Sequence, residues 1–193
     1  MAVDSIVVTL CTIMFLQNTS TSIFAPFFPI EAQEKGIDIV WVGLLMGLFA
    51  FIYIFAAYFT GKGLKRIGRT YALRLGFLLL ICQLFGMGSI YFLQTKTLFL
   101  AIAFTAQICG GLGAGLNTTT SLALLTSLYP DEREKMMGLF EAATGLGFLF
   151  GPMIGAGLYS VGGYVAPFYG ICGCYILVYP LLMLISRKIQ NIQ

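Results

Sequence analysis

Six long apolar runs constrain the fold of this chain more than any other feature of its sequence. They lie at about residues 6–28, 40–60, 71–93, 97–128, 136–159 and 164–186. Each holds roughly the 20 apolar residues that an α-helix needs to cross a bilayer. The chain is also 59% hydrophobic and 10% charged, with a mean hydropathy of +0.91, and these values indicate a membrane protein.

A bilayer core accepts two kinds of spanning structure, helices and closed β-barrels, because other backbones leave polar groups unbonded. None of the six runs shows the alternation of apolar and polar residues that barrel strands require. The sequence therefore predicts an all-α membrane protein, with a single six-transmembrane-helix bundle over residues 1–193. The first run follows no basic segment and ends without a small-residue cleavage site, so we expect it to stay as the first helix.

Basic residues gather on one side of the predicted bundle. Lys and Arg in short loops are retained on the cytoplasmic side of a membrane. Nine of the eleven lie around the second-to-third and fourth-to-fifth connections or in the tail: Lys62, Lys65, Arg66, Arg69, Arg74, Arg133, Lys135, Arg187 and Lys188. We therefore expect both termini in the cytoplasm and an acidic outer loop with Glu31, Glu34 and Asp38. We attribute the net charge of +3 to this topology and predict no nucleic-acid partner.

The chain contains no His, and its five Cys all lie inside predicted spans. A Ser/His/Asp or Cys/His arrangement for nucleophilic catalysis therefore cannot form. Cys172 and Cys174 are two residues apart, so they point to different faces of a helix, and we interpret them as packing residues. We predict no enzymatic activity, no metal site and no cofactor.

Six consecutive polar residues, 17–22 (QNTSTS), interrupt the second half of the first run. They cover every face of a helix, and polar side chains in lipid are costly unless they meet protein or water. Ser and Thr can bond back to their own helix, but Gln17 and Asn18 need other partners. We expect Gln17 and Asn18 to line a cavity, with packing between helices as the alternative.

The fourth run combines Gln107, several glycines between residues 110 and 115, and a polar segment that begins at Asn117. Gly111 and Gly115 have the spacing that lets two helices approach closely, so we predict an interhelical contact there. Gln107 and Asn117 are further candidates for polar contacts in a cavity.

The fifth run contains Gly147, Gly151 and Gly155, which recur every four residues and so share one helix face. Such a face predicts tight contact with another helix, and Pro152 removes a backbone donor and is expected to bend the run. Glu141 lies one turn into the same run. A buried carboxylate in a span predicts a proton or cation site. The alternative is that Glu141 reaches the nearby cytoplasmic surface.

Several of these segments resemble motifs of the major facilitator superfamily. Residues 145–157 (GLGFLFGPMIGAG) resemble its helix 5 motif, G-x3-G-P-x2-G-G, at four positions, with Ala156 in place of the last Gly. The matching residues are Gly147, Gly151, Pro152 and Gly155. The fourth run resembles the helix 4 motif, R-x2-Q-G-x-G, with Gln107 at the Arg position and Gly110 at the Gln position.

Residues 61–70 (GKGLKRIGRT) resemble the superfamily's cytoplasmic loop between helices 2 and 3, G-x3-D-[RK]-x-G-R. The matching residues are Gly61, Arg66, Gly68 and Arg69, and Lys65 occupies the Asp position. In the family the Asp and Arg of this loop are held to form a charged cluster that latches the inner gate. The resemblance places the gate here at these residues, and Lys65 would remove the acidic member of the cluster.

Within the superfamily, residues 22–36, 138–152 and 162–168 are most similar to the vesicular amine transporters, particularly the vesicular polyamine branch. The resemblance covers the first six helices of a twelve-helix protein made of two six-helix halves. It implies alternating access, a cavity lined by helices 1 and 4, helix 5 against the other half, and exchange of an organic cation for protons. It also implies a vesicle or other organelle membrane, with the plasma membrane as the alternative.

We therefore predict proton-coupled transport of a polyamine- or monoamine-like cation across a lipid membrane. The chain would act as half or a fragment of a twelve-helix transporter, with a second six-helix half as its partner. Lys65 and Gln107 replace charged family residues that the resemblance associates with gating and proton coupling. They motivate an alternative function, that of a non-transporting membrane subunit or regulatory partner derived from a transporter.

Overall fold

A computed structural model describes residues 2–190 of the chain, with side chains for residues 5–187. The helices are α1 (Ala2–Glu34), α2 (Ile39–Ile67), α3 (Arg69–Ser89), the 3-10 helix η1 (Ile90–Phe92), α4 (Lys96–Leu128), α5 (Arg133–Gly162) and α6 (Val165–Gln190). Within the described residues, all six α-helices are long and apolar enough to cross a membrane. The predicted all-α bundle with six spans is confirmed.

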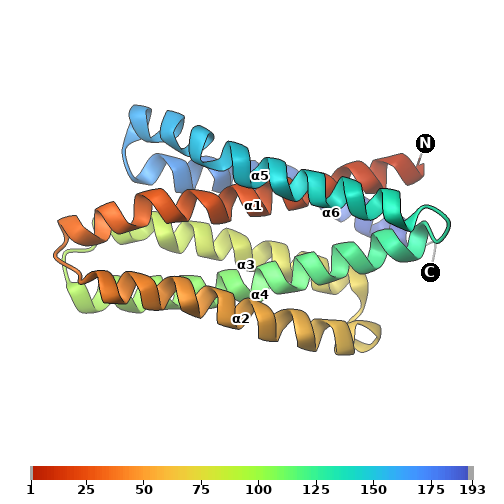
Figure 1. Cartoon of the computed structure of the whole chain (residues 1–193), viewed down its shortest axis with the longest axis horizontal. Coiled ribbons are helices and arrows are strands. Elements are labelled where there is room, and N and C mark those ends of the chain that lie inside the picture. Colours follow the sequence, from red (N-terminus) through yellow and green to blue (C-terminus); the bar gives the residue numbers. More distant parts are fainter. Residues whose placement is uncertain (1, 191–193) are drawn as a thin grey trace.

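The bundle is organised around two closely packed groups of helices. α1 packs along α5, and α4 packs against both α2 and α3, while α3 also contacts α6. In Figure 1, α1 and α5 lie on one side of the bundle and α2 and α4 on the other. The start of α1, the end of α6, and the α2–α3 and α4–α5 turns all lie at one end. The start of α1, the end of α6 and the basic residues of the α2–α3 and α4–α5 turns therefore share one end of the bundle.

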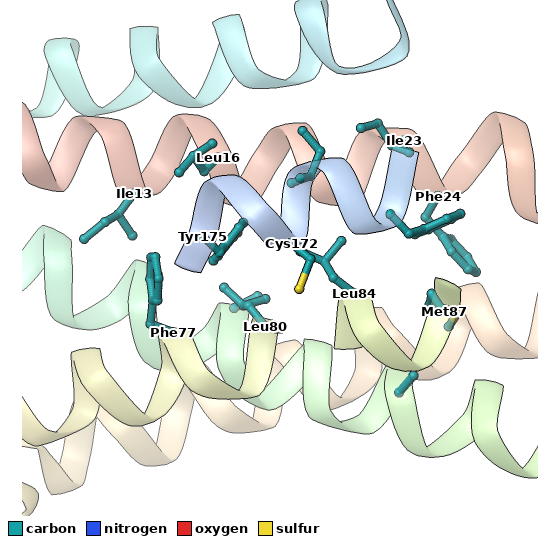
Figure 2. Packing of buried hydrophobic residues seen from close by; sticks show 14 of the residues in the cluster. Ile13, Leu16, Ile23, Phe24, Phe77, Leu80, Leu84, Met87, Cys172 and Tyr175 are labelled. Atoms are coloured by element: carbon teal, nitrogen blue, oxygen red, sulfur yellow. The ribbon is translucent and has the colours of Figure 1, made fainter. Parts of the chain in front are cut away.

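Burial is unequal among the spans, and the difference decides which helices form the core. In the most apolar window of each helix, 61% of α1 and 50% of α4 are buried, against 17% of α2 and 22% of α5. The core joins α1, α3, α4 and α6, and Figure 2 shows Phe77 and Leu80 of α3 pointing toward Tyr175 of α6. The Phe77 and Tyr175 rings lie 4.7 Å apart between centroids. α2 and α5 keep apolar faces on the outside of the bundle.

The predicted cytoplasmic loop at residues 61–70 is almost entirely helical. Gly61, Lys65 and Arg66 lie on the last turns of α2, and Arg69 is the first residue of α3. The reversal takes place at Gly68, whose φ of +86° lies in a region that favours glycine. The prediction of a loop was wrong because polar residues at a membrane surface stay helical when water solvates their side chains.

Glu31 was predicted in an acidic loop, and this was wrong. It lies in α1 and is only 5% exposed. Its Oε1 is 3.4 Å from Lys35 Nζ, and this ion pair lets the carboxylate remain in the helix. Lys35 Nζ also donates to three carbonyl oxygens at 2.6–3.3 Å, those of Ile90, Tyr91 and Leu93. At Tyr164, which follows α5, burial and the Glu31 charge raise the pKa of the phenol.

The face of α5 that carries Gly147, Gly151 and Gly155 packs against α1, and we call this contact the α1/α5 seam. A methyl group added at Gly147 would lie 2.5 Å from Phe15 O, and one at Gly155 would lie 2.6 Å from the Phe27 ring. The predicted tight contact is confirmed. The resemblance placed helix 5 against a second half, but these glycines meet a helix of the same chain. α5 continues through Pro152, which is exposed on another face.

Gly111 and Gly115 of α4 form the corresponding contact with α2, the α2/α4 seam. A methyl group at Gly111 would lie 2.8 Å from Ile52 Cβ, and one at Gly115 would lie 2.6 Å from Ala56 Cβ and 2.9 Å from Tyr53 O. Such distances are shorter than ordinary van der Waals contact, so only glycine fits at these two positions without a shift of the helices. The predicted interhelical contact at Gly111 and Gly115 is confirmed.

Candidate functional site

A pocket of about 330 Å³ lies between the two seams. It is lined from α1, α2, α4 and α5 by Gln17, Asn18, Thr21, Phe49, Tyr53, Ala114, Thr118, Phe140, Glu141, Thr144 and Phe148. We call it the first pocket. Its lining combines polar groups of α1 and α4, one carboxylate and four aromatic rings, so it can bind a molecule that has both a charge and apolar surface.

Gln17 is the central polar residue of the first pocket. It is 4% exposed, and its Nε2 donates to Thr118 Oγ1 at 2.8 Å, which ties α1 to α4. Its Oε1 is buried and has no hydrogen-bond partner among the described residues. A buried amide oxygen without a partner is destabilising unless a ligand or water donates to it. Gln17 therefore lines the pocket and carries a buried acceptor that no described residue uses.

The rest of the polar run on α1 is protected from lipid, because none of residues 17–22 is exposed. Asn18 Nδ2 donates to Met14 O at 2.8 Å, and the hydroxyls of Ser20 and Thr21 donate to Gln17 O. Ser22 Oγ is 3.0 Å from Thr19 O. The hydroxyls bond back to their own helix, as the sequence allowed. Asn18 does so too, so the expectation that it needs a partner elsewhere was wrong, because its side chain reaches the carbonyl one turn earlier. Gln17 and Asn18 both line the first pocket.

Glu141 lines the first pocket from α5 and is exposed, which agrees with the alternative of a surface position better than with a buried carboxylate. The α5 face that carries it lies outside the contacts that α5 makes with α1 and α6. Among the described residues no ion pair involves Glu141, and Lys135 pairs instead with Glu132 at 2.9 Å. The carboxylate is therefore available to a cationic ligand.

A second pocket of about 350 Å³ adjoins the first. The two pockets share Thr21, Phe49 and Phe148 in their walls. The second is mainly apolar, and its deepest polar groups are the carboxamides of Gln83 on α3 and Gln107 on α4. Gln83 Nε2 donates to Gln107 Oε1 at 3.0 Å, and the two side chains are 7% and 1% exposed.

The structure brings some of the predicted polar residues together and separates others. Gln17, Asn18 and Glu141 share the first pocket, and Gln107 lies in the second. Asn117 lines neither pocket. It is fully buried on the α3 side of α4, where a methyl group added at Gly76 would lie 2.6 Å from its Oδ1. Asn117 is the neighbour of the pocket residue Thr118 but points to another face of α4, and the sequence does not distinguish the two because the face that α4 turns toward α3 depends on packing.

Sequence reasoning missed Gln83 and Thr118. Gln83 is the one strongly polar side chain in the middle of α3, and a lone carboxamide in an apolar run is a usable signal for a partner in the membrane. Thr118 lies inside a run of threonines, so only packing could distinguish it from its neighbours Thr119 and Thr120. The aromatic residues of the pocket carry no sequence signal, because aromatic side chains are common throughout the spans.

The residues matched to the gating loop lie at the end of the bundle that also holds the chain ends. Lys65 and Arg66 are exposed, and Arg69 Nη1 donates to Ser127 Oγ at 2.8 Å, which joins the start of α3 to the end of α4. Among the described residues no carboxylate pairs with these three side chains. The group thus forms a basic surface beside the Gly68 turn.

Comparison with known proteins agrees with the fold. A family model described as Major Facilitator Superfamily matches residues 10–191. This match includes the first and second pockets, both seams and the basic surface. It confirms the resemblance that the motifs of α2, α4 and α5 carried.

Named relatives are similar over most of the chain. The mouse MFS-type transporter SLC18B1 is 33% identical over 159 residues, which are 81% of this chain and 34% of that protein. The human synaptic vesicular amine transporter is 29% identical over 164 residues, which are 84% of this chain and 29% of that protein. The Bacillus subtilis multidrug efflux protein YfmO is 28% identical over 187 residues, 94% of this chain and 42% of that protein. The chain thus spans about a third of the length of the first of these relatives.

Proposed function

The chain belongs to the major facilitator superfamily, and we propose that it forms one half of a transporter for a small organic cation, polyamine- or monoamine-like. The first pocket would hold the cation, with Glu141 as the counter-charge. The observation that carries this proposal is the placement of Glu141, Gln17 and four aromatic rings around one cavity. The vesicular amine transporter among the relatives supports an amine as the substrate class.

The lining of the first pocket suits an ammonium group in three ways. Glu141 supplies a negative charge, and the unpartnered Gln17 Oε1 accepts a hydrogen bond from an N–H group. The rings of Phe49, Tyr53 and Phe148 present π-faces that attract cations, an interaction that strengthens when water is excluded. None of the residues that line this pocket is positively charged, so an anion would have no counter-charge there.

Glu141 also provides a physical basis for exchange against protons. A carboxylate holds either a proton or an organic cation, but it cannot neutralise both at once. Protonation from one side of the membrane would therefore release the cation, and loss of the proton on the other side would restore the site. Coupled to alternating access, this competition yields antiport of the amine against protons.

The proposal includes a second six-helix half. The pocket is walled by α1, α2, α4 and α5, and the exposed apolar faces of α2 and α5 flank it. Such faces suit either lipid or another membrane domain, and a domain placed there would cover Glu141 and close the cavity. Gly61, Lys65, Arg66, Gly68 and Arg69 would then lie at the inner gate, with both termini in the cytoplasm. We place the protein in a vesicle or other organelle membrane.

Uptake into proteoliposomes tests this function. The protein, alone and together with a second six-helix half, is reconstituted in vesicles with an acidic interior, and accumulation of labelled spermidine and of labelled serotonin is measured. We expect accumulation of at least one of the two amines, and this accumulation should collapse when the proton gradient is dissipated. Glu141→Gln should lower it by about tenfold or more, because the amide cannot carry the charge.

Glu134→Gln is the matched control, since Glu134 is an exposed carboxylate in the first turn of the same helix. It should leave uptake unchanged. Equal uptake by the wild type and Glu141→Gln would remove Glu141 from the proposed role. Absence of uptake for both amines with the second half supplied would instead favour the non-transporting subunit.

A further inference from the structure

The two adjoining pockets differ in charge, and this difference bears on the kind of cation that fits. Glu141 is the one charged side chain among the residues that line either pocket. The second pocket is lined by Phe24, Ala25, Met46 and the shared aromatic residues, with neutral hydroxyls and carboxamides as its polar groups. A ligand that extends from the first pocket into the second therefore passes from a negative charge to a neutral environment.

The neutral polar groups of the second pocket are not equivalent. The hydroxyl of Thr21 donates a hydrogen bond to Gln17 O, and the hydroxyl of Ser22 donates one to Thr19 O. Gln83 and Gln107 share one hydrogen bond, which occupies one donor of Gln83 and one acceptor of Gln107. A carboxamide offers two donor hydrogens and an acceptor oxygen. Among the described residues, Gln83 Oε1 accepts no hydrogen bond and Gln107 Nε2 donates none.

This carboxamide pair is held in a fixed position by the backbone of α4. Gly110 lies one turn after Gln107, and a methyl group added there would overlap the Gln83 carboxamide. The glycine therefore provides the space in which Gln83 lies flat against α4 and reaches Gln107. Because both side chains are more than nine-tenths buried and border the pocket, they form a rigid, neutral pair of donor and acceptor groups at its end.

We infer that the Gln83–Gln107 pair is a subsite for a neutral hydrogen-bonding group at the far end of the substrate, which carries a single positive charge. This inference rests on the proposed function, because it takes Glu141 as the site of the ammonium. A second ammonium at the far end would be desolvated among apolar side chains without a counter-charge, which is costly. A hydroxyl or amide there instead gains hydrogen bonds from Gln107 and to Gln83.

The rise of α4 gives a length scale for the probes. Ala114 lines the first pocket and Gln107 the second, and seven residues of helix separate them by about 10 Å. An eight-carbon chain has about this reach. Three probes therefore share one scaffold and differ at the far end alone: octylamine, the eight-carbon amino alcohol and the eight-carbon diamine.

Equilibrium binding of these probes to the purified, detergent-solubilised protein tests the subsite. The wild type should bind the amino alcohol about threefold to tenfold more tightly than octylamine, which is the effect of one net hydrogen bond. It should bind the diamine more weakly than the amino alcohol. Gln107→Leu should abolish the advantage of the amino alcohol over octylamine. Partitioning into the micelle is the same for all variants, so differences between variants report the site.

Gln107→Glu provides a test that loss of folding cannot imitate. A carboxylate at this position supplies the missing counter-charge, so the diamine should gain about tenfold or more in affinity relative to octylamine. Gln94→Leu, at an exposed glutamine between η1 and α4, is the control and should change nothing. If Gln107→Leu weakens all three probes equally, the pair merely ties α3 to α4 and the subsite is refuted.

Tighter binding of the diamine than of the amino alcohol to the wild type would also overturn the subsite. A different result would overturn the proposed function itself. Glu141→Gln should weaken all three probes, including octylamine, because each carries the ammonium. If octylamine binding does not depend on Glu141, then the ammonium does not bind there, whatever the Gln107 variants show.

Discussion

The two glycine seams are alike in spacing but differ in what the glycines meet. In the α2/α4 seam, Gly111 and Gly115 lie against the apolar side chains of Ile52 and Ala56. In the α1/α5 seam, Gly147 and Gly151 lie against the polar run of α1, where Thr19 and Ser22 approach Gly147 O to 3.4 Å, and Gly155 lies against Phe27 and Ile23. One seam therefore depends on van der Waals contact, whereas the other adds hydrogen bonds to the backbone of the neighbouring helix.

This difference explains why a run of six polar residues occurs in a lipid-spanning helix. Ser22 and Thr19 turn toward α5 and belong to the seam, whereas Gln17, Asn18 and Thr21 turn toward the first pocket. The same segment thus supports a helix contact on one side and a binding surface on the other. On α4 the two roles fall to different residues, because Gly111 and Gly115 face α2, whereas Ala114 and Thr118 line the first pocket.

The largest expected effect comes from filling the α1/α5 seam. Gly151→Leu would place a side chain onto Ser22 and the Thr19 carbonyl, where neither helix can move without loss of packing. We expect destabilisation of about 3 kcal/mol or more, measured as earlier thermal loss of the monodisperse peak of the detergent-solubilised protein. Gly157→Leu is the control, because a side chain there meets open space. Equal stability of the two variants would contradict the seam.

A smaller effect separates the polar seam from the apolar one. Gly151→Ala and Gly115→Ala should each destabilise by about 1–2 kcal/mol. Ser22→Ala should recover most of the first loss, because it removes the overlapping hydroxyl and leaves the nearest backbone atom, Thr19 O, at 3.0 Å.

Ala56→Gly should recover less of the Gly115→Ala loss. Two backbone atoms, Ala57 N and Tyr53 O, remain at 2.9 Å from the added methyl group. The comparison is a pair of double-mutant cycles on thermal stability. Equal recovery in both seams would mean that the side chains that face the glycines do not distinguish them.

The smallest effect concerns the polar link between the seams. Gln17→Leu removes the hydrogen bond to Thr118, and such bonds between membrane helices contribute about 0.6 kcal/mol on average. A double-mutant cycle with Thr118→Val should therefore give a coupling of this size. Asn18→Leu is the control, because Asn18 bonds to its own helix, and its coupling to Thr118→Val should be near zero. Equal couplings would show that Gln17 makes no specific link between α1 and α4.

Much of the fold could be predicted because lipid limits the choices. The six spans follow from apolar runs of membrane-crossing length, and the two seams follow from glycines four residues apart. The errors occurred where charges end an apolar run. Glu31 and the residues after Gly61 looked like loops, yet α1 and α2 continue through them, because Lys35 neutralises Glu31 and water solvates the end of α2.

The candidate site could be predicted only in part. Gln17, Asn18 and Glu141 reach one pocket, as three polar residues in spans suggested. Asn117 turns toward α3, and Gln83 joins Gln107 from a helix that showed no cluster of polar residues. Which face of a helix meets a cavity depends on rotation about its axis, and that rotation is set by the packing of all its neighbours.

The sequence by itself determined that the protein lies in a lipid bilayer, which segments form helices and which helix faces can make close contacts. Each of these depends on the local order of apolar, polar and small residues. Only the tertiary structure decided that the glycines of α5 meet α1 and that Glu141 stays exposed beside a pocket with a neutral extension. Those features depend on which helices become neighbours. Which helices pack together depends on how well their complete surfaces fit one another. This fit is a property of the folded bundle and cannot be read from any single segment.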